Sequence, residues 1–429
     1  MNSIIAKIRL ALTDAVLMRR IGFTLLLIAI FRALSVIPIP DVNQAALASL
    51  LAQAGVGQFL GIVNVLSGGG LSQLSIVMLG IGPYITASII MQVLTFVSPK
   101  LKAMYQGEDG QGSRRKYIQY GRMITVPIAI IQGFSFLSLL QNQGVLGADG
   151  YGLMEKIIGT LIITAGAMVV MWIGELISEF GIGNGSSMIV ATGIVAGLPQ
   201  FLAQNYLSFS QDQLPIYIAF AVAAFIAILA VVFINEAERP IPVTYAKQVR
   251  GNRVYGGIST YLPIRLTQAG VMPIIFAMAI IAFPQILVNL LTFTDNVRVI
   301  AFGQEVITFL NTPWIYGITT FILVFLFTYF FTAVTFDPYQ ISENLQKRGA
   351  FIPGVRPGQS TAEHLGHTIT RLNLFGAVFL GTIAVLPILV SSLTQVQTLA
   401  LGGTSLLIIV SVILDTLKKI NAQLTAKEY

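Results

Sequence analysis

Two segments far apart in the chain open in the same way: Gly80-Ile81-Gly82-Pro83-Tyr84-Ile85 and Gly270-Val271-Met272-Pro273-Ile274-Ile275. In each, a proline follows a glycine by three residues, and an aliphatic run of membrane-spanning length comes next. Glycine and proline are common in membrane helices, so one such opening has a simple structural explanation. A matching pair in two halves of a membrane protein indicates instead a pathway between the halves. We expect the pair to mark such a pathway.

The composition predicts a membrane protein. Of the 429 residues, 55% are hydrophobic and only 10% are charged, too few charges to cover a soluble protein of this size. The chain has no cysteine, which excludes disulfides and cysteine-based nucleophiles or metal sites. Its net charge of +7 is typical of basic cytoplasmic loops. No small-x-small cleavage site follows the first apolar run, so we expect that run to remain as a helix.

Ten apolar runs are long enough to cross the hydrocarbon core as helices. They lie at about residues 22–40, 76–97, 118–140, 155–175, 186–204, 214–235, 267–290, 313–336, 373–392 and 400–417. If each crosses once from a cytoplasmic N-terminus, all 25 basic residues except Arg32, Lys156 and Arg298 belong to cytoplasmic segments. This asymmetry predicts that both termini are cytoplasmic.

One cytoplasmic segment departs from this charge pattern. Residues 175–185 carry Glu175 and Glu179 and no base. The segment is short, so we attribute the departure to local function or packing rather than to a wrong topology.

The ten spans divide into an N-terminal half, residues 1–205, and a C-terminal half, residues 206–429. Each half has five spans, and an odd number forces the halves into opposite orientations. The two Gly-x-x-Pro openings then fall in the second span of each half. The predicted fold is therefore all-α and polytopic, with ten transmembrane helices in two inverted five-helix halves around a central pore.

Residues 55–75 form an unusual apolar segment. It is too short and too rich in glycine to span the membrane. A re-entrant element on the outer side fits, because non-helical backbone at membrane depth must lie within protein or a water-filled cavity. The alternative is an amphipathic hairpin on the outer leaflet.

The sequence lacks the usual signatures of catalysis. His364 and His367 are three residues apart, and Glu363 precedes them, so the order and spacing of a zinc peptidase are absent. There is no P-loop, and Gly181-Ile182-Gly183-Asn184-Gly185 is better explained as a tight turn between two spans. We predict no enzymatic activity, no metal and no cofactor.

An inverted-repeat secondary transporter is the main alternative. Such carriers usually place ionisable groups near the membrane midplane. Here the predicted midplane holds aliphatic residues and a few amides, including Gln92 and Gln132. A pathway without charged side chains selects poorly by charge. It therefore suits a conduit for varied cargo better than a carrier of a small ion.

Two long basic loops, at about residues 235–265 and 337–371, separate spans of the C-terminal half. Loops of this length are usually functional. We expect them to dock a large acidic partner such as ribosomal RNA, or a motor protein. The simpler explanation is that cytoplasmic loops are basic in any case.

Several motifs in order along the chain resemble the SecY family, the channel subunit of the bacterial Sec protein translocon. They include Ile37-Pro38-Ile39-Pro40, Ser67-Gly68-Gly69-Gly70, residues 79–92, residues 181–185, Gly193-Ile194-Val195-Ala196-Gly197-Leu198-Pro199, Tyr245-Ala246-Lys247, Leu262-Pro263-Ile264-Arg265, residues 349–358 and Gly402-Gly403-Thr404-Ser405. The resemblance implies a channel in the bacterial inner membrane. It passes unfolded secretory polypeptides across the membrane and releases membrane helices sideways into lipid.

The resemblance also assigns residues. It implies a constricting aliphatic ring of Ile81, Ile85, Val190, Ile275 and Ile408. It implies a plug at about residues 58–73, with Phe59, Leu60, Ile62, Val63, Asn64, Ser67, Gly68, Gly69 and Gly70. It implies a lateral gate with polar positions at Gln92, Gln132 and Thr267, and partner docking at Arg250, Arg253 and Arg356.

The resemblance implies partners as well. They are the small membrane subunits SecE and SecG, the motor ATPase SecA, the ribosome, signal sequences, nascent polypeptides and membrane lipids. Val190 stands where the family most often has Ile, Thr267 where Asn is common, and Asn252 replaces one of a basic pair.

Overall fold

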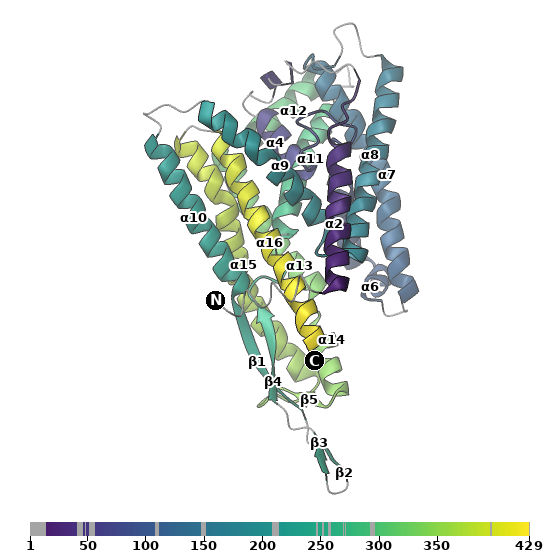
Figure 1. Cartoon of the computed structure of the whole chain (residues 1–429), viewed down its shortest axis with the longest axis vertical. Helices are drawn as coiled ribbons and strands as arrows, with labels where there is room; N and C mark the ends of the chain where they lie inside the picture. The colour runs from purple at the N-terminus through teal and green to yellow at the C-terminus, as the bar shows by residue number, and fades with distance from the viewer. Residues whose placement is uncertain are drawn as a thin grey trace.

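The computed structural model describes residues 14–40, 46–47, 49–50, 56–107, 111–146, 152–207, 214–245, 248–250, 253–255, 259–268, 270, 272–291, 297–394 and 397–428. Its longer helices are α2 (Ala15–Leu34), α5 (Gly82–Val97), α7 (Gln111–Asn142), α8 (Leu153–Phe180), α9 (Gly185–Leu207), α10 (Leu214–Glu236), α11 (Met272–Leu291), α13 (Pro313–Thr335), α15 (Gln359–Thr394) and α16 (Gln397–Glu428). Shorter helices are α4 (Val56–Leu66), α6 (Pro99–Gln106), α12 (Val297–Leu310) and α14 (Pro338–Lys347). The long helices form an elongated bundle (Figure 1).

Five helix contacts recur in the two halves. In the first half, α5 packs on α7, α7 on α8, α8 on α9, and α2 on both α8 and α9. In the second half, α11 packs on α13, α13 on α15, α15 on α16, and α10 on both α15 and α16. These are the same contacts when the helices of each half are numbered in order. The internal packing is thus that of a repeat, while the boundary at residue 205 stays a prediction.

The two Gly-x-x-Pro openings have the same local structure. Gly80 and Gly270 both have left-handed backbones, with φ of 53° and 57°. Pro83 and Pro273 are each the second residue of a helix, α5 or α11. A helix tolerates proline there because the first-turn amide has no partner within the helix. The sequence duplication is therefore a structural one.

Each of the ten predicted spans overlaps one of the ten longer helices, but their lengths differ. Among the described residues, four helical segments are long and apolar enough to cross a bilayer: Gly112–Asn142, Leu153–Phe180, Pro313–Lys347 and Gln359–Val390. A fifth candidate is the pair Gly82–Val97 and Pro99–Gln106, bent by 117°. The number ten itself stays a prediction.

The predicted first span, 22–40, was wrong at both ends. Helix α2 begins at Ala15, where the Asp14 carboxylate caps the amide of Val16, and it ends at Leu34. The residues that follow pair with the segment after α4, because the amide of Ile39 donates to Leu74 and that of Ile76 to Ile37. Two prolines, Pro38 and Pro40, favour this extended pairing over helix.

A small sheet joins the two long basic loops. The all-α prediction did not include this sheet. Strand β1 (Glu238–Tyr245) pairs antiparallel with β4 (Ser259–Arg265) on one side and with β5 (Ala350–Phe351) on the other. Strands β2 (Gln248–Arg250) and β3 (Arg253–Tyr255) form a separate hairpin. The sheet projects from one end of the bundle (Figure 1), which we call the sheet end.

Candidate functional site

Five aliphatic side chains from four helices meet in one buried cluster where the two halves face each other. They are the five residues of the predicted ring, Ile81, Ile85, Val190, Ile275 and Ile408, and each is at most 3% exposed. Helix α5 and the residue before it supply two, while α9, α11 and α16 supply one each. The structure thus brings together all five positions.

The repeat explains how the ring is assembled. Ile85 and Ile275 each lie two residues after the proline that opens α5 or α11, so the two halves contribute equivalent residues. Val190 and Ile408 lie on α9 and α16, the last helices of the two halves. Branched aliphatic side chains around a narrow neck expel water and offer ions no ligand. The arrangement can form a seal without a charged gate.

Helix α4 lies between the halves and covers the ring region. It contacts α9, α11 and α16, and its Val65 and Leu66 belong to the same buried cluster as the ring. Leu60 is fully buried in a second cluster, and Val63 packs against that cluster. The predicted plug is therefore partly helical. The side chains of Phe59 and Ile62 lie outside the described residues.

Hydrogen bonds from Asn64 and Ser67 hold the turn that ends α4. The Asn64 side-chain oxygen accepts from the amide of Ser72, and its carbonyl accepts from the amide of Gly69. The Ser67 hydroxyl donates to the Asn64 carbonyl and accepts from the amide of Leu71. These bonds satisfy backbone groups that would otherwise be buried without partners.

Glycines let the end of α4 sit directly on other backbones. A Cβ at Gly193 of α9 would lie 2.0 Å from the Cα of Gly68, and one at Gly80 would lie 2.2 Å from the Cα of Ser67. Gly68 and Gly69 both have positive φ, which favours glycine. The turn after α4 thus packs directly against the backbone of α9 and against the backbone just before α5. No such close contact could be read from the sequence.

A cavity of about 880 Å³ leads from the sheet end to Ile81 and Ile85. Polar residues line its walls, among them Arg114, Glu175 and Glu179. Arg122 of α7 forms an ion pair with Glu175 of α8, with both nitrogen–oxygen distances 2.9 Å. The structure therefore places a polar vestibule on one side of the apolar ring.

The three predicted polar gate residues have different surroundings. Gln132 of α7 is buried, and its side-chain amide donates to the hydroxyl of Thr86 at 3.5 Å. Gln92 of α5 lines the vestibule, and its buried side-chain oxygen has no hydrogen-bond partner among the described residues. Thr267 instead donates to the Asn235 side-chain oxygen of α10 at 3.1 Å. Thr267 lies before α11 rather than within it.

Other residues bridge the seam between α5 and α7 of one half and α11 and α13 of the other. The Ser135 hydroxyl of α7 donates to the carbonyl of Ile286 in α11 at 3.0 Å. The rings of Phe96 in α5 and Phe330 in α13 are 5.0 Å apart. The sequence held no signal for these contacts, because neither spacing nor residue type reveals a partner in the other half.

The sheet end carries the predicted docking arginines. Arg356 is exposed in the turn between β5 and α15, and its carbonyl accepts from the Thr361 hydroxyl. Arg250 and Arg253 face each other across the β2–β3 hairpin as paired residues. Their side chains lie outside the described residues. Within the described chain, no group of three His, Cys, Asp or Glu side chains could hold a metal ion.

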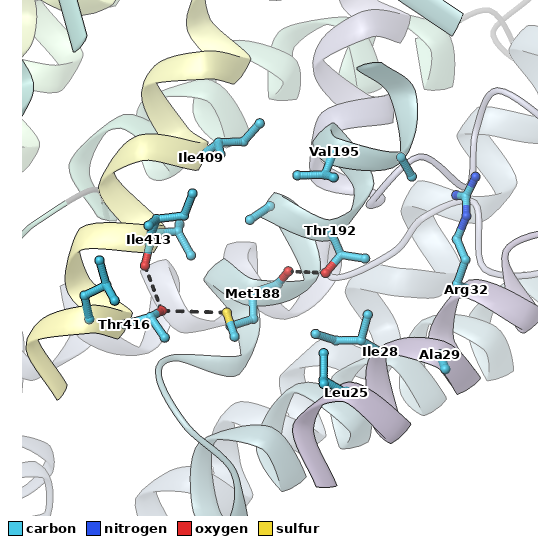
Figure 2. A pocket seen from close by; sticks show the side chains of 14 residues that line it. Leu25, Ile28, Ala29, Arg32, Met188, Thr192, Val195, Ile409, Ile413 and Thr416 are labelled. Atoms are coloured by element: carbon cyan, nitrogen blue, oxygen red, sulfur yellow. Dashed lines mark hydrogen bonds between the residues drawn. The ribbon is translucent and has the colours of Figure 1, made fainter. Parts of the chain in front are cut away.

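An apolar groove of about 620 Å³ lies between α2, α9 and α16 (Figure 2). Leu25 and Ile28 of α2, Val195 of α9 and Ile413 of α16 line it. Arg32 stands at its edge and donates to the Ser35 hydroxyl at 3.3 Å. The groove can hold an apolar helix or acyl chains.

The paired halves, the apolar neck and the polar vestibule define a polytopic membrane protein of the channel class. A family model described as SecY matches residues 75–417. Curated relatives are named protein translocase subunit SecY. The relative from Mycobacterium bovis is 38% identical over 428 residues, which cover 96% of both chains. The relative from Thermotoga maritima is 40% identical over 417 residues, which cover 96% of this chain and 93% of the relative. This chain belongs to the SecY family.

Solved structures have the same fold. One, described as a protein conducting channel, gives a TM-score of 0.64 at 18% identity and covers 94% of this chain and 92% of the other. Another, Sec61 in a canine ribosome-channel complex, gives a TM-score of 0.60 at 17% identity with the same coverage. At these identities the likeness concerns the fold alone.

Proposed function

We propose that the chain is a protein-conducting channel, which passes unfolded polypeptides through the ring. The observation that carries this proposal is the convergence of Ile81, Ile85, Val190, Ile275 and Ile408 in one buried cluster between two repeated halves. Family membership supports it, because the curated relatives are named as translocase subunits. Nothing in the vestibule or the ring favours a secondary transporter.

The chemistry of the neck suits a polypeptide. Its side chains are aliphatic and meet only through apolar contacts, so the neck can open for a passing chain and close behind it without breaking a hydrogen bond or an ion pair. They offer a peptide backbone no hydrogen bond that would hold it in place. When no polypeptide is present, α4 covers the ring and the aliphatic contacts exclude water. The sequence has no P-loop, and we propose that a ribosome or a cytosolic ATPase drives the movement.

A cysteine at Ile85 tests the proposal. The natural chain contains no cysteine, so this single thiol is unique. We expect it to cross-link to a cysteine placed within a secretory chain that has been arrested during transport. A cysteine at the exposed Ile90, five residues further along α5, serves as the control. Equal cross-linking from both positions would show that the polypeptide does not pass the ring.

The seam between α5 and α7 and between α11 and α13 is the proposed lateral exit for membrane helices. Apolar side chains pack across it, and the Ser135–Ile286 hydrogen bond and the Phe96–Phe330 ring contact are two further contacts that must break. Gln92 and Gln132 lie beside it on α5 and α7. A disulfide between cysteines at Ser135 and Ile286 should block helix release; release at the normal rate would exclude this exit.

The sheet end is the proposed docking surface for the ribosome or for a motor such as SecA. The sheet that joins the two basic loops supports this, because it holds both as one platform. We expect Arg356→Glu to reduce motor binding and export by about ten-fold, since it removes and reverses a charge that an acidic partner would contact. Binding measured with purified motor, and export by inverted vesicles, check this.

The matched control for Arg356→Glu is Arg298→Glu on α12, at the opposite end of the bundle (Figure 1). Both changes alter the net charge equally. If the two variants export equally well, Arg356 has no role in docking.

We further propose that the sheet end is cytoplasmic, in the inner membrane of a bacterium, with both termini on that side. The basic residues gathered in its loops support this orientation. The groove between α2, α9 and α16 is suited to the membrane helix of a small subunit such as SecE, while SecG is expected elsewhere on the bundle. A cysteine at Val195 that fails to cross-link to the co-expressed subunit would rule this groove out.

A further inference from the structure

The wall that α8 contributes to the vestibule is negatively charged. Glu175 and Glu179 lie one helical turn apart near the end of α8 and both line the cavity that leads to Ile81 and Ile85. The Arg122 guanidinium pairs with Glu175. Glu179 is exposed, and its carboxylate forms no hydrogen bond or ion pair with any described residue. One carboxylate is therefore held in place, and the other is free to meet a ligand.

These charges oppose what helix stability favours. The last turn of a helix carries a partial negative charge and favours bases, yet α8 has Glu179 there and no base. The first turns of α7 carry a partial positive charge and favour acids, yet Arg114 and Arg115 lie there and no acid does. Both helices thus place the disfavoured sign at the mouth of the same cavity. Local rules broken together at one site are typical of function.

The charge distribution along the sequence gives an independent reason. Residues 175–185, which include the last turns of α8, are the segment that departs from the otherwise basic character of its side of the membrane. A structural role would be met by the Arg122–Glu175 pair alone, which joins α7 to α8. The carboxylate of Glu179 adds no hydrogen bond or ion pair among the described residues. Its charge therefore faces the contents of the vestibule.

We propose that Glu179, next to the Arg122–Glu175 pair, is a counter-charge site for lysine or arginine residues that flank the apolar segment of an incoming polypeptide. Polypeptides addressed to a membrane carry such a basic flank before an apolar stretch. With the flank at Glu179 on the α8 wall, the apolar stretch lies toward the ring and α5. Arg114 and Arg115 on the α7 wall repel the same flank, so the two walls orient it. This inference rests on the proposed function and specifies which chains enter in which direction.

Peptide binding tests the site without transport. Three fluorescent peptides share one apolar segment and differ in a flank of lysines, glutamines or glutamates. We expect the purified complex to bind the lysine peptide more tightly than the glutamine peptide. In Glu179→Gln this preference should fall by about two- to five-fold, the range of an exposed ion pair, and high salt should have the same effect. Glu179→Asp should keep it.

Charge reversal makes the test sharper. Glu179→Lys should bind the glutamate peptide more tightly than the lysine peptide. Glu305→Gln, an exposed acid on α12 outside the vestibule, is the control and should behave as the natural protein does. A preference for the lysine peptide that persists in Glu179→Lys would overturn the inference.

Transport in proteoliposomes separates this inference from the proposed function. If the lysine preference depends on Glu179 but no polypeptide crosses the membrane, the binding site stands and the channel function fails. If secretory chains cross normally and the lysine flank confers the same advantage in Glu179→Lys, the channel function stands and this inference fails. A uniform loss of binding to all three peptides would show a structural role and would also overturn it.

Discussion

Replacing Ile85 and Ile275 together by glycine should make the resting channel leak ions. Each change removes the whole side chain of a buried ring residue, one from each half. The widened neck would admit water, and a continuous water column conducts ions. Planar-bilayer recordings should show a steady conductance where the natural channel shows almost none.

The control removes equal bulk from the same helices. Ile90 of α5 and Leu287 of α11 are 40% and 46% exposed, so they face away from the ring. Glycine at these positions carries the same intrinsic helix cost, about 1 kcal/mol at each. If the control leaks as much as the ring variant, or if neither leaks, the assignment of the ring is wrong.

Gly193→Ala should weaken both the fold and the seal, although alanine is ordinarily the better helix former by about 1 kcal/mol. The added Cβ would lie 2.0 Å from the Cα of Gly68, where both neighbours are backbone and neither can rotate away. Overpacking of this kind costs about 1–3 kcal/mol. The end of α4 must move, so a lower thermal unfolding temperature in detergent and a raised ion conductance are the expected results.

Gly197→Ala, one turn further along α9, is the matched control. No described atom outside the adjoining backbone of α9 lies within 4 Å of a Cβ built there. The substitution should leave stability unchanged or slightly raised. A Gly193→Ala protein as stable and as tightly sealed as Gly197→Ala would show that α4 does not depend on this backbone contact.

Repetition in the sequence predicted much of the fold. The paired openings at Gly80 and Gly270 already contained the left-handed glycine and the first-turn proline that the structure shows. Hydropathy located a helix for every predicted span. It placed ends poorly. Helix α2 begins at Ala15, before the predicted start at residue 22, because Arg19 and Arg20 interrupt the apolar run without interrupting the helix.

The sheet could not be predicted by the same reasoning. Pro240 and Pro242 lie in β1, the middle strand of three, and Pro263 lies opposite Pro240 in β4. Proline lacks the amide that a strand donates, so its presence argues against a central strand. Here only a two-residue strand, β5, pairs with the other side of β1, through Thr244 and Tyr245 beyond the prolines. The prolines of β1 therefore need no amide to pair with β5.

The candidate site was predictable where family motifs fix a position on a helix, as for the ring. Contacts of the site were not predictable when the contacting residue belongs to the other half or to a turn. Thr267 is an example: its neighbour Asn235 is set by the end of α10, which no local pattern reveals. The close approach of Gly193 to Gly68 is another, because a glycine in a sequence does not indicate which backbone lies against it.

The ring has a consequence for the order in which the protein is made. Its five residues are spread from Ile81 to Ile408, and the last belongs to α16, the final helix described. A growing chain therefore cannot complete its own neck until that helix has been synthesised and has taken its place beside α9. Until then the earlier helices lie in the membrane with an incomplete ring. A product truncated before α16 would be an open fragment rather than a shorter channel.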